Sequence, residues 1–371
     1  MPHLECFRAT NQLSTGEKST LYLRPHVGED DFVDAAVHED HWESSVRSST
    51  LTTRGWCCQE RLLSPRVLHF TETQLFWECR HCARSEDNLF YSPRPRGIVN
   101  VLERSVPDEG SLIVGPLQSY RMLSAAELLD RWYHIVVQFE YSARRLTHPG
   151  DKLIALAGLA STFKALLQTR YPAGLWAEDL IAGLCWRRSA SGRKAVQYRC
   201  PSWSWASQDS AVAYPLSVRK GLKYHARVLD AEVSHRTSNE LGAVTGGSLT
   251  LCGPTLRGRL GATAPMSSPH NVIDLDDDPV LIKTLELDNG ISIEAKLDND
   301  SGEPRPNVIA CIFLEDTWAE HGVLFALLLQ QTEHGTGNFQ RVGLAQKNQQ
   351  QLSTAQLSAL ETAPMTTLVV V

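Results

Sequence analysis

The chain has 371 residues, of which 42% are hydrophobic and 21% charged, and a formal net charge of -6 at pH 7. These values are ordinary for a folded protein with a sizeable core, and the mild negative charge does not favour binding to nucleic acid, anionic membranes or acidic substrates. The nine cysteines are scattered and odd in number, unlike a secreted disulfide scaffold. The sequence shows no signal peptide and no apolar run of about 20 residues. We therefore expect a cytoplasmic chain with reduced thiols.

The first 50 residues are polar and weakly periodic, and a short strand is expected only at residues 21–23. A denser segment follows. Residues 55–63 predict a short helix, which ends before Pro65 because proline disfavours helical geometry in the residue before it. Residues 67–70 and 74–79 predict two strands joined by a polar turn.

Residues 85–115 contain several prolines and glycines and predict a long surface loop. The clearest helix follows this loop, because Ser124 and Glu127 fit a capping box. Its apolar side chains repeat at helical spacing and are Leu128, Trp132, Ile135, Val136 and Phe139.

Two more helices are expected further along the chain. One runs over residues 152–167, with Asp151 as its N-cap. Its inward side chains are Leu153, Leu156, Ala157 and Ala160. The other runs over residues 176–186, and its apolar side chains are Leu180, Ile181 and Leu184.

After residue 200 the pattern changes to strands. Residues 201–207 alternate aromatic and small polar side chains, as a half-buried strand does. Asn289-Gly290 between two alternating runs predicts a hairpin. Further strands are expected at residues 247–253, 308–314 and 323–329. These elements predict an α+β protein with a helical segment at 116–199 and a β-rich module at 200–371.

The segment from residue 54 to residue 66 reads RGWCCQERLLSPR and contains Arg54, Gly55, Trp56, Gln59, Glu60, Arg61, Leu63, Ser64 and Arg66. A Trp-Glu-Cys run follows as Trp77, Glu78 and Cys79. Downstream lie Pro201, Trp203 and Trp205, and later Arg341-Val342-Gly343. Together these residues resemble the last conserved block of the fungal heterokaryon-incompatibility (HET) domain family and the segments that usually follow it. Cys57 and Cys58 replace the residues usual in that family.

The resemblance implies a fold similar to TIR domains, with a central parallel sheet, and a role in nonself recognition and programmed cell death. The family's first two blocks, similar to YxALSYxWG and LWIDxxCIxQ, do not occur in the chain. We therefore expect residues 1–115 to be the C-terminal part of a truncated HET domain. A sheet that lacks its first strands is expected to expose an unpaired edge or an apolar face.

Glu60 is the one catalytic candidate, because TIR-like proteins can cleave NAD with a glutamate. A TIR-like NAD-cleaving enzyme is thus the alternative to a protein that acts by protein contacts. We favour the second interpretation, in which Arg54 and Glu60 pair or cap around the short helix.

Cys79 and Cys82 form a CxxC with His81 inside it, and Cys57 and Cys58 precede it by about twenty residues. A zinc site usually has two well-spaced pairs, which this chain lacks, so free thiols are the favoured interpretation. His69 alternates with apolar neighbours and is expected to be a satisfied core or edge residue.

The pair Trp203 and Trp205 has two interpretations, stacking on a ligand or packing between helices and sheet, and we favour packing. The acidic residues Asp274, Asp276, Asp277 and Asp278 lack the glycine and distal glutamate of an EF-hand and are expected in a solvated loop. No metal, cofactor or nucleic acid is expected, and the expected partners are proteins that the sequence does not identify.

Overall fold

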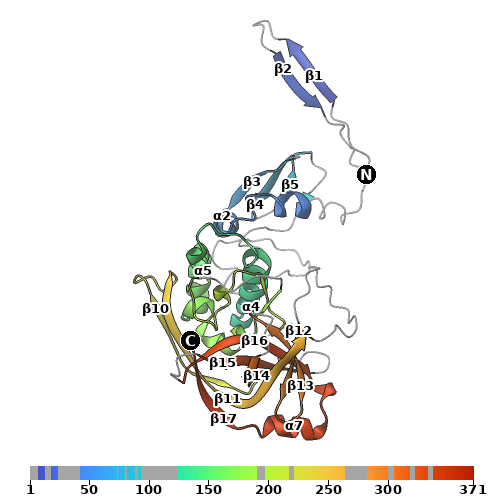
Figure 1. The fold of residues 1–371 in the computed structure, drawn as a ribbon. Helices are drawn as coiled ribbons and strands as arrows, with labels where there is room; N and C mark the ends of the chain where they lie inside the picture. Colours follow the sequence, from blue (N-terminus) through green and yellow to red (C-terminus); the bar gives the residue numbers. More distant parts are fainter. Residues whose placement is uncertain are drawn as a thin grey trace. The chain divides into compact units, whose positions relative to one another are not determined.

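The structure is a computed structural model that describes residues 7–12, 18–23, 42–72, 74–79, 82–87, 91–92, 123–189, 197–216, 221–263, 282–299, 305–317, 322–332 and 337–371. Figure 1 shows the helices and strands in chain order. Two compact units are present: residues 1–53 with 61–100, and residues 54–60 with 101–371. Helix α2 (Trp56–Leu63) is the short helix expected at residues 55–63, and the boundary between the units falls within it.

The first unit contains a hairpin and a four-stranded antiparallel sheet. The hairpin pairs β1 (Phe7–Gln12) with β2 (Lys18–Leu23), which confirms the strand at residues 21–23. The sheet has the order β3 (Arg66–Phe70), β4 (Leu75–Cys79), β5 (Ala83–Ser85) and β6 (Tyr91–Ser92). The prediction of a loop at residues 85–115 is wrong at residues 91–92, which form β6. Most of that stretch lies outside the described residues.

The two faces of this sheet differ in burial. One face packs on Trp42, which precedes η1 (Glu43–Arg47) and meets the Phe76 ring edge-on with 5.4 Å between centroids. Because side chains alternate along a strand, the opposite face carries Leu68, Phe70 and Trp77. These side chains are 46%, 74% and 38% exposed, and together they form the exposed sheet face. Among the described strands, only β4 pairs with β3, and the exposed sheet face is the apolar face that was expected.

The helical part of the second unit begins with α4 (Ala125–Asp130), whose capping box between Ser124 and Glu127 is confirmed. It continues without a break as the wider helix η3 (Arg131–Tyr141). Trp132 and Val136 are fully buried, as predicted for that face.

The second and third predicted helices are shorter than expected. Residues 149–156 form two single turns, η4 (Pro149–Asp151) and η5 (Ile154–Leu156), before α5 (Ala157–Leu167). Asp151 does not cap α5, whose N-cap is Leu156; its carboxylate instead accepts a hydrogen bond from Trp56 Nε1 at 3.2 Å. The third helix is reduced to η7 (Ala177–Asp179) and α6 (Leu180–Gly183), although Leu180, Ile181 and Leu184 are all buried.

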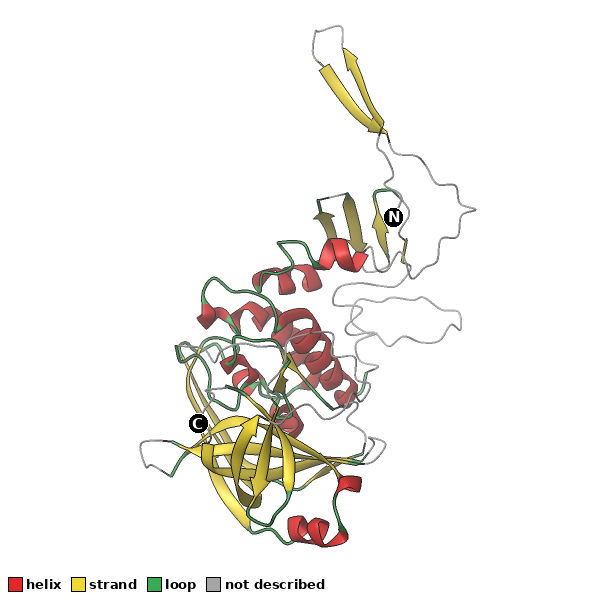
Figure 2. Ribbon diagram, turned by 45° about the vertical axis from the view of Figure 1, so that its right-hand side comes forward, coloured by secondary structure: helices red, strands yellow, loops and turns green. Residues whose placement is uncertain are grey.

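The large sheet of the second unit closes on itself. Its strands are β9 (Leu222–Tyr224), β10 (Arg227–His235), β11 (Val244–Thr263), β12 (Ile282–Leu287), β13 (Ser292–Leu297), β14 (Arg305–Asp316), β15 (Val323–Gln331), β16 (Phe339–Asn348) and β17 (Met365–Val370). β11 pairs with β12 on one edge and with β14 on the other, which joins the ends of the order β11-β12-β13-β16-β15-β14. The strands drawn in yellow in Figure 2 curve accordingly around a common interior.

This closed sheet confirms the strands predicted at residues 247–253, 308–314 and 323–329 and encloses a hydrophobic core. The Asn289-Gly290 hairpin joins β12 to β13, and Gly290 has the positive φ of 80° that such a turn requires. The side chains of the interior are apolar, among them Leu285, Ile293, Val308, Leu328 and Ala345. The capped helix α7 (Thr354–Glu361) adds Leu360 to the same core. The protein is thus α+β, as the sequence predicted.

Candidate functional site

The motif residues at the start of α2 are tied to residues 145–158. The backbone N–H of Gly55 donates to Arg145 O at 2.7 Å, and a Cβ at this position would lie 2.5 Å from Leu146 Cδ2. A larger residue at this position would therefore require the Leu146 side chain to move. The Gln59 side chain accepts a hydrogen bond from Gly158 N at 3.0 Å. Gly55 and Gln59 therefore act as packing and docking residues.

Glu60, the candidate catalytic glutamate, is exposed on α2. Burial raises the pKa of the nearby Cys57 thiol, and the charge of Glu60 raises it further. Cys57 therefore remains a neutral thiol near pH 7 and is a poor nucleophile. Glu60 thus lies beside this thiol on an exposed part of α2.

Glu78 is the motif carboxylate with the densest set of contacts. Arg61 approaches both of its oxygens, with Nε at 3.0 Å and Nη2 at 3.3 Å. His69 Nε2 lies 2.7 Å from Glu78 Oε2, which confirms His69 as a satisfied residue. Burial on its own would raise the pKa of Glu78, but the His69 hydrogen bond and the Arg61 charge lower it to about 2. The arrangement stabilises an ion pair on the buried face of β4.

Replacement of Glu78 by Gln is expected to destabilise the first unit at neutral pH. The pKa of Glu78 falls from 4.5 in the unfolded chain to about 2 in the folded one. Its contribution to the free energy of unfolding is therefore complete above pH 4.5 and is lost as the pH falls toward 2. At 1.36 kcal/mol per unit, that contribution is on the order of 3 kcal/mol. Urea unfolding followed by circular dichroism should show a gap between wild type and Glu78→Gln that closes across this window. Glu72→Gln, on the exposed turn after β3, should show no such gap, and an equal gap at both ends of the window would contradict the account.

The Trp203-Trp205 segment is a buried turn, so the half-buried strand predicted there is wrong. Ser204 begins the short helix η8 (Trp205–Ser207), and its hydroxyl accepts from Ala206 N at 3.1 Å. Trp203 and Trp205 are both fully buried, so packing is the correct one of the two interpretations. Trp205 Nε1 donates to the carbonyl of Gly174 at 2.8 Å. Gly174 has a φ of 94°, and a Cβ there would lie 3.0 Å from the Trp205 ring.

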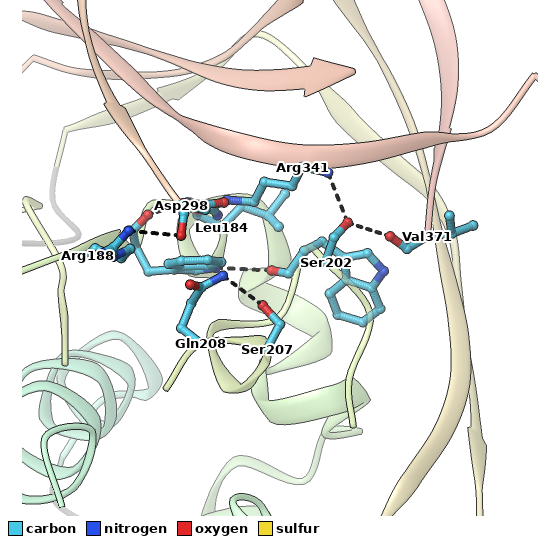
Figure 3. Close-up of polar contacts among 10 residues, drawn as sticks. Leu184, Arg188, Ser202, Ser207, Gln208, Asp298, Arg341 and Val371 are labelled. Atoms are coloured by element: carbon cyan, nitrogen blue, oxygen red, sulfur yellow. Dashed lines mark hydrogen bonds and ion pairs between the residues drawn. The ribbon is translucent and has the colours of Figure 1, made fainter. Parts of the chain in front are cut away.

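Arg341 connects this turn to the large sheet (Figure 3). Its side chain is fully buried, and its Nε lies 2.9 Å from a carboxylate oxygen of Asp298. Its other nitrogens donate to the carbonyls of Leu184, at 2.7 Å, and Trp186. The guanidinium also lies 3.4 Å from the centre of the Trp186 ring. One side chain thus joins β16, the residues after α6 and the carboxylate after β13.

Neighbouring polar groups extend the network. Trp186 Nε1 donates to Trp203 O at 3.1 Å, and the hydroxyl of Ser202 accepts from the backbone N–H of Arg341 at 2.9 Å (Figure 3). The same Ser202 hydroxyl donates to Val371 O. Ser202 of the PSWSW segment and Arg341, which are 139 positions apart in the sequence, therefore meet at one structural site.

A cavity of about 470 Å³ lies beside this network in the second unit. Its walls include Arg199, Cys200, Ser202, Ser207, Gly247 and Gln340. Burial raises the pKa of Cys200 to about 12, so its thiol is not an activated nucleophile. Arg199 is already paired with Asp209 at 2.6 Å. The cavity thus offers polar contacts but no activated group for covalent catalysis.

Lys152 is a buried residue that the sequence analysis missed. Its Nζ donates to Ser142 O at 3.0 Å, and Tyr141 OH donates to the Lys152 carbonyl at 2.6 Å. Burial, together with the charge of Arg199, lowers the pKa of Lys152 to about 7. In the sequence this lysine follows Asp151 in a helical pattern typical of a solvated face, so no signal distinguished it.

The thiols of Cys79 and Cys82 come together at the end of β4, with 3.8 Å between sulfur atoms. His81 lies outside the described residues, as do Asp274, Asp276, Asp277 and Asp278. Within the described parts of the chain, no group of three or more His, Cys, Asp or Glu side chains is arranged to bind a metal ion. No helix in those parts is both long and apolar enough to span a membrane.

The chain is thus an α+β protein. Most of the motif residues whose contacts are described stabilise its structure. Comparison with models of known families, with curated proteins and with solved structures found no match to this chain.

Proposed function

We propose that this chain is a fungal heterokaryon-incompatibility protein that acts in the cytoplasm through protein contacts, in nonself recognition and programmed cell death. In this proposal residues 1–115 are the C-terminal part of an incomplete, TIR-like HET domain, and strands β3 to β6 are the antiparallel end of it. The sequence resemblance at residues 54–79 is the source of the family assignment.

The exposed sheet face is the observation that supports action through protein contacts. Leu68 and Trp77 are register partners on β3 and β4, so their side chains are neighbours on one surface, and Phe70 extends it. Exposed apolar clusters of this kind mark interaction sites. The motif carboxylate Glu78 lies on the opposite, buried face, where it contacts Arg61 and His69.

Inducible expression of the full chain in fungal hyphae tests the proposal, with cell death scored by uptake of a membrane-impermeant dye. Wild type is expected to cause death, and Leu68→Glu with Phe70→Glu to abolish it, because the two carboxylates would prevent apolar docking. Leu229→Glu with Met365→Glu is the matched control, since those side chains are 50% and 58% exposed on the other unit. Death caused equally by all three proteins, or by none, would contradict the proposal.

The alternative function is cleavage of NAD by Glu60. The exposure of Glu60 is the observation in its favour, because a substrate can reach that carboxylate. Incubation of the purified chain with NAD, with nicotinamide measured by chromatography, separates the two functions. Our proposal expects no release above buffer, and release that Glu60→Gln abolishes would establish the enzyme instead.

A further inference from the structure

The thiols of Cys79 and Cys82 face each other across the hairpin of β4 and β5. The two strands pair antiparallel with Glu78 opposite Ala83, so Cys79 and Cys82 are the next opposed pair. The backbone N–H of Cys79 donates to Cys82 O at 2.9 Å, as in a hydrogen-bonded pair. Side chains of directly opposed residues lie on the same face of a sheet. The register therefore places both sulfur atoms on one side of the hairpin.

The separation of the two residues suits a disulfide bond. Residues that face each other in a hydrogen-bonded pair have Cα atoms about 5.5 Å apart. Disulfides form between residues whose Cα atoms are about 4.4–6.8 Å apart. The two sulfur atoms lie 3.8 Å apart. They would have to approach by about 1.8 Å to form the bond, which rotation of the side chains can supply without a shift of the strands.

This pair of thiols is within reach of small molecules in solution. Cys79 is two positions after Trp77 on β4, so its side chain projects from the same side as the exposed sheet face. Cys79 and Cys82 are both partly exposed. Other cysteines of the chain are buried, namely Cys58, Cys185, Cys200 and Cys311. A small oxidant would therefore reach the hairpin pair more readily than the thiols of the core.

The surroundings assign different chemical roles to the two sulfur atoms. The backbone N–H of Cys82 donates to Cys79 Sγ at 3.4 Å, which stabilises negative charge on that sulfur. Burial and the neighbouring Cys79 raise the pKa of Cys82, whereas the charge of Arg84 lowers it. Since the thiolate is the form that attacks a disulfide, Cys79 is the expected nucleophile. Cys82 is then the thiol that completes the reaction.

We propose that Cys79 and Cys82 are a reversible oxidation site, at which a small disulfide of the glutathione type (RSSR) converts the two thiols into an intrachain disulfide. The Cys79 thiolate attacks one sulfur of RSSR, forms a mixed disulfide and releases one RS⁻. The Cys82 sulfur loses its proton, attacks the Cys79 sulfur and releases the second RS⁻. The two thiol protons pass to the released thiolates, so two thiols and RSSR give one disulfide and two RSH. This modification does not depend on a role in nonself recognition.

The test uses the full chain, reduced and then equilibrated with mixtures of reduced and oxidised glutathione. The remaining thiols are blocked with iodoacetamide, and the chain is digested with trypsin. Trypsin cleaves between the two cysteines, after Arg80, and leaves Cys79 on the peptide 67–80 and Cys82 on the peptide 81–84. Mass spectrometry should find these two peptides linked, and reduction should separate them.

Three variants and one change of solvent show whether the pair and the fold are responsible. Cys79→Ser and Cys82→Ser should each lose the linked peptides completely, and Cys82→Ser should retain glutathione on Cys79. Cys252→Ser, which removes a partly exposed thiol on β11, should form the linked peptides as wild type does. In urea at the same glutathione ratio the linked fraction of wild type should fall, because the strand register no longer holds the sulfur atoms together.

Three results would overturn the inference. The first is that wild type gives no linked peptides even in excess oxidised glutathione. The second is that Cys79 or Cys82 is joined mainly to another cysteine of the chain. The third is an equal linked fraction with and without urea. All three are measured on wild type, so they decide the matter even if a serine variant fails to fold.

Discussion

Replacement of Arg341 by Met is expected to lower the free energy of unfolding of the second unit by about 3–5 kcal/mol, the cost of removing one member of a buried ion pair. The side chain is fully buried, and the substitution removes donors to Asp298, to Leu184 O and to Trp186 O. The methionine side chain is unbranched and nearly as long as that of arginine. The loss of stability therefore reflects the missing charge and hydrogen bonds more than a cavity. Urea unfolding followed by circular dichroism measures it.

Two further variants identify the cause. Arg259→Met, on an exposed arginine of β11, should change stability by no more than about 0.5 kcal/mol. Asp298→Asn combined with Arg341→Met should cost less than the sum of the two single changes, because the residues share one interaction. If Arg341→Met lowers the free energy of unfolding by less than about 1 kcal/mol, the network contributes little to stability.

Replacement of Trp205 by Ala is the second large effect, expected at about 3–5 kcal/mol for a fully buried tryptophan. The ring meets Tyr141 edge-on, with 6.1 Å between centroids, and its Nε1 bonds to Gly174 O. Trp205→Phe keeps most of the volume but leaves that carbonyl without its donor, so we expect a smaller loss of about 1–3 kcal/mol. Thermal and urea unfolding of the two variants check the order. Equal stability of Trp205→Ala and wild type would mean that the turn is not part of the core.

The strands and caps that depend on local signals could be predicted from the sequence. Residues 67–70 and 74–79 are mainly apolar runs on either side of a polar turn, Asn289-Gly290 suits a tight turn, and Ser124 with Glu127 satisfies a helix end. Each of these signals lies within a few residues of the element that it specifies. The apolar face of this sheet was expected instead from the resemblance, because a sheet that lacks its first strands exposes an edge or a face.

Features that depend on distant contacts could not be predicted. Residues 201–207 alternate like a strand, yet Trp203 and Trp205 are buried together in a turn because helices and sheet enclose them from several sides. Asp151 resembles a helix cap, but its carboxylate binds Trp56, 95 positions earlier. The pairing of Arg341 with Asp298 and the closure of β11 onto β14 likewise have no local signature.

The motif residues therefore combine two roles in this account. Gly55 and Gln59 dock α2 on residues 145–158, and Arg61 and Glu78 form a buried ion pair within the first unit. We propose that the exposed sheet face, and not Glu60, carries the activity.

The most direct measurement is the hyphal death assay with Glu60→Gln and the Leu68→Glu, Phe70→Glu double variant compared side by side at equal protein levels. The account predicts that Glu60→Gln causes death as wild type does, while the double variant does not. Loss of death in Glu60→Gln with full activity in the double variant would contradict it.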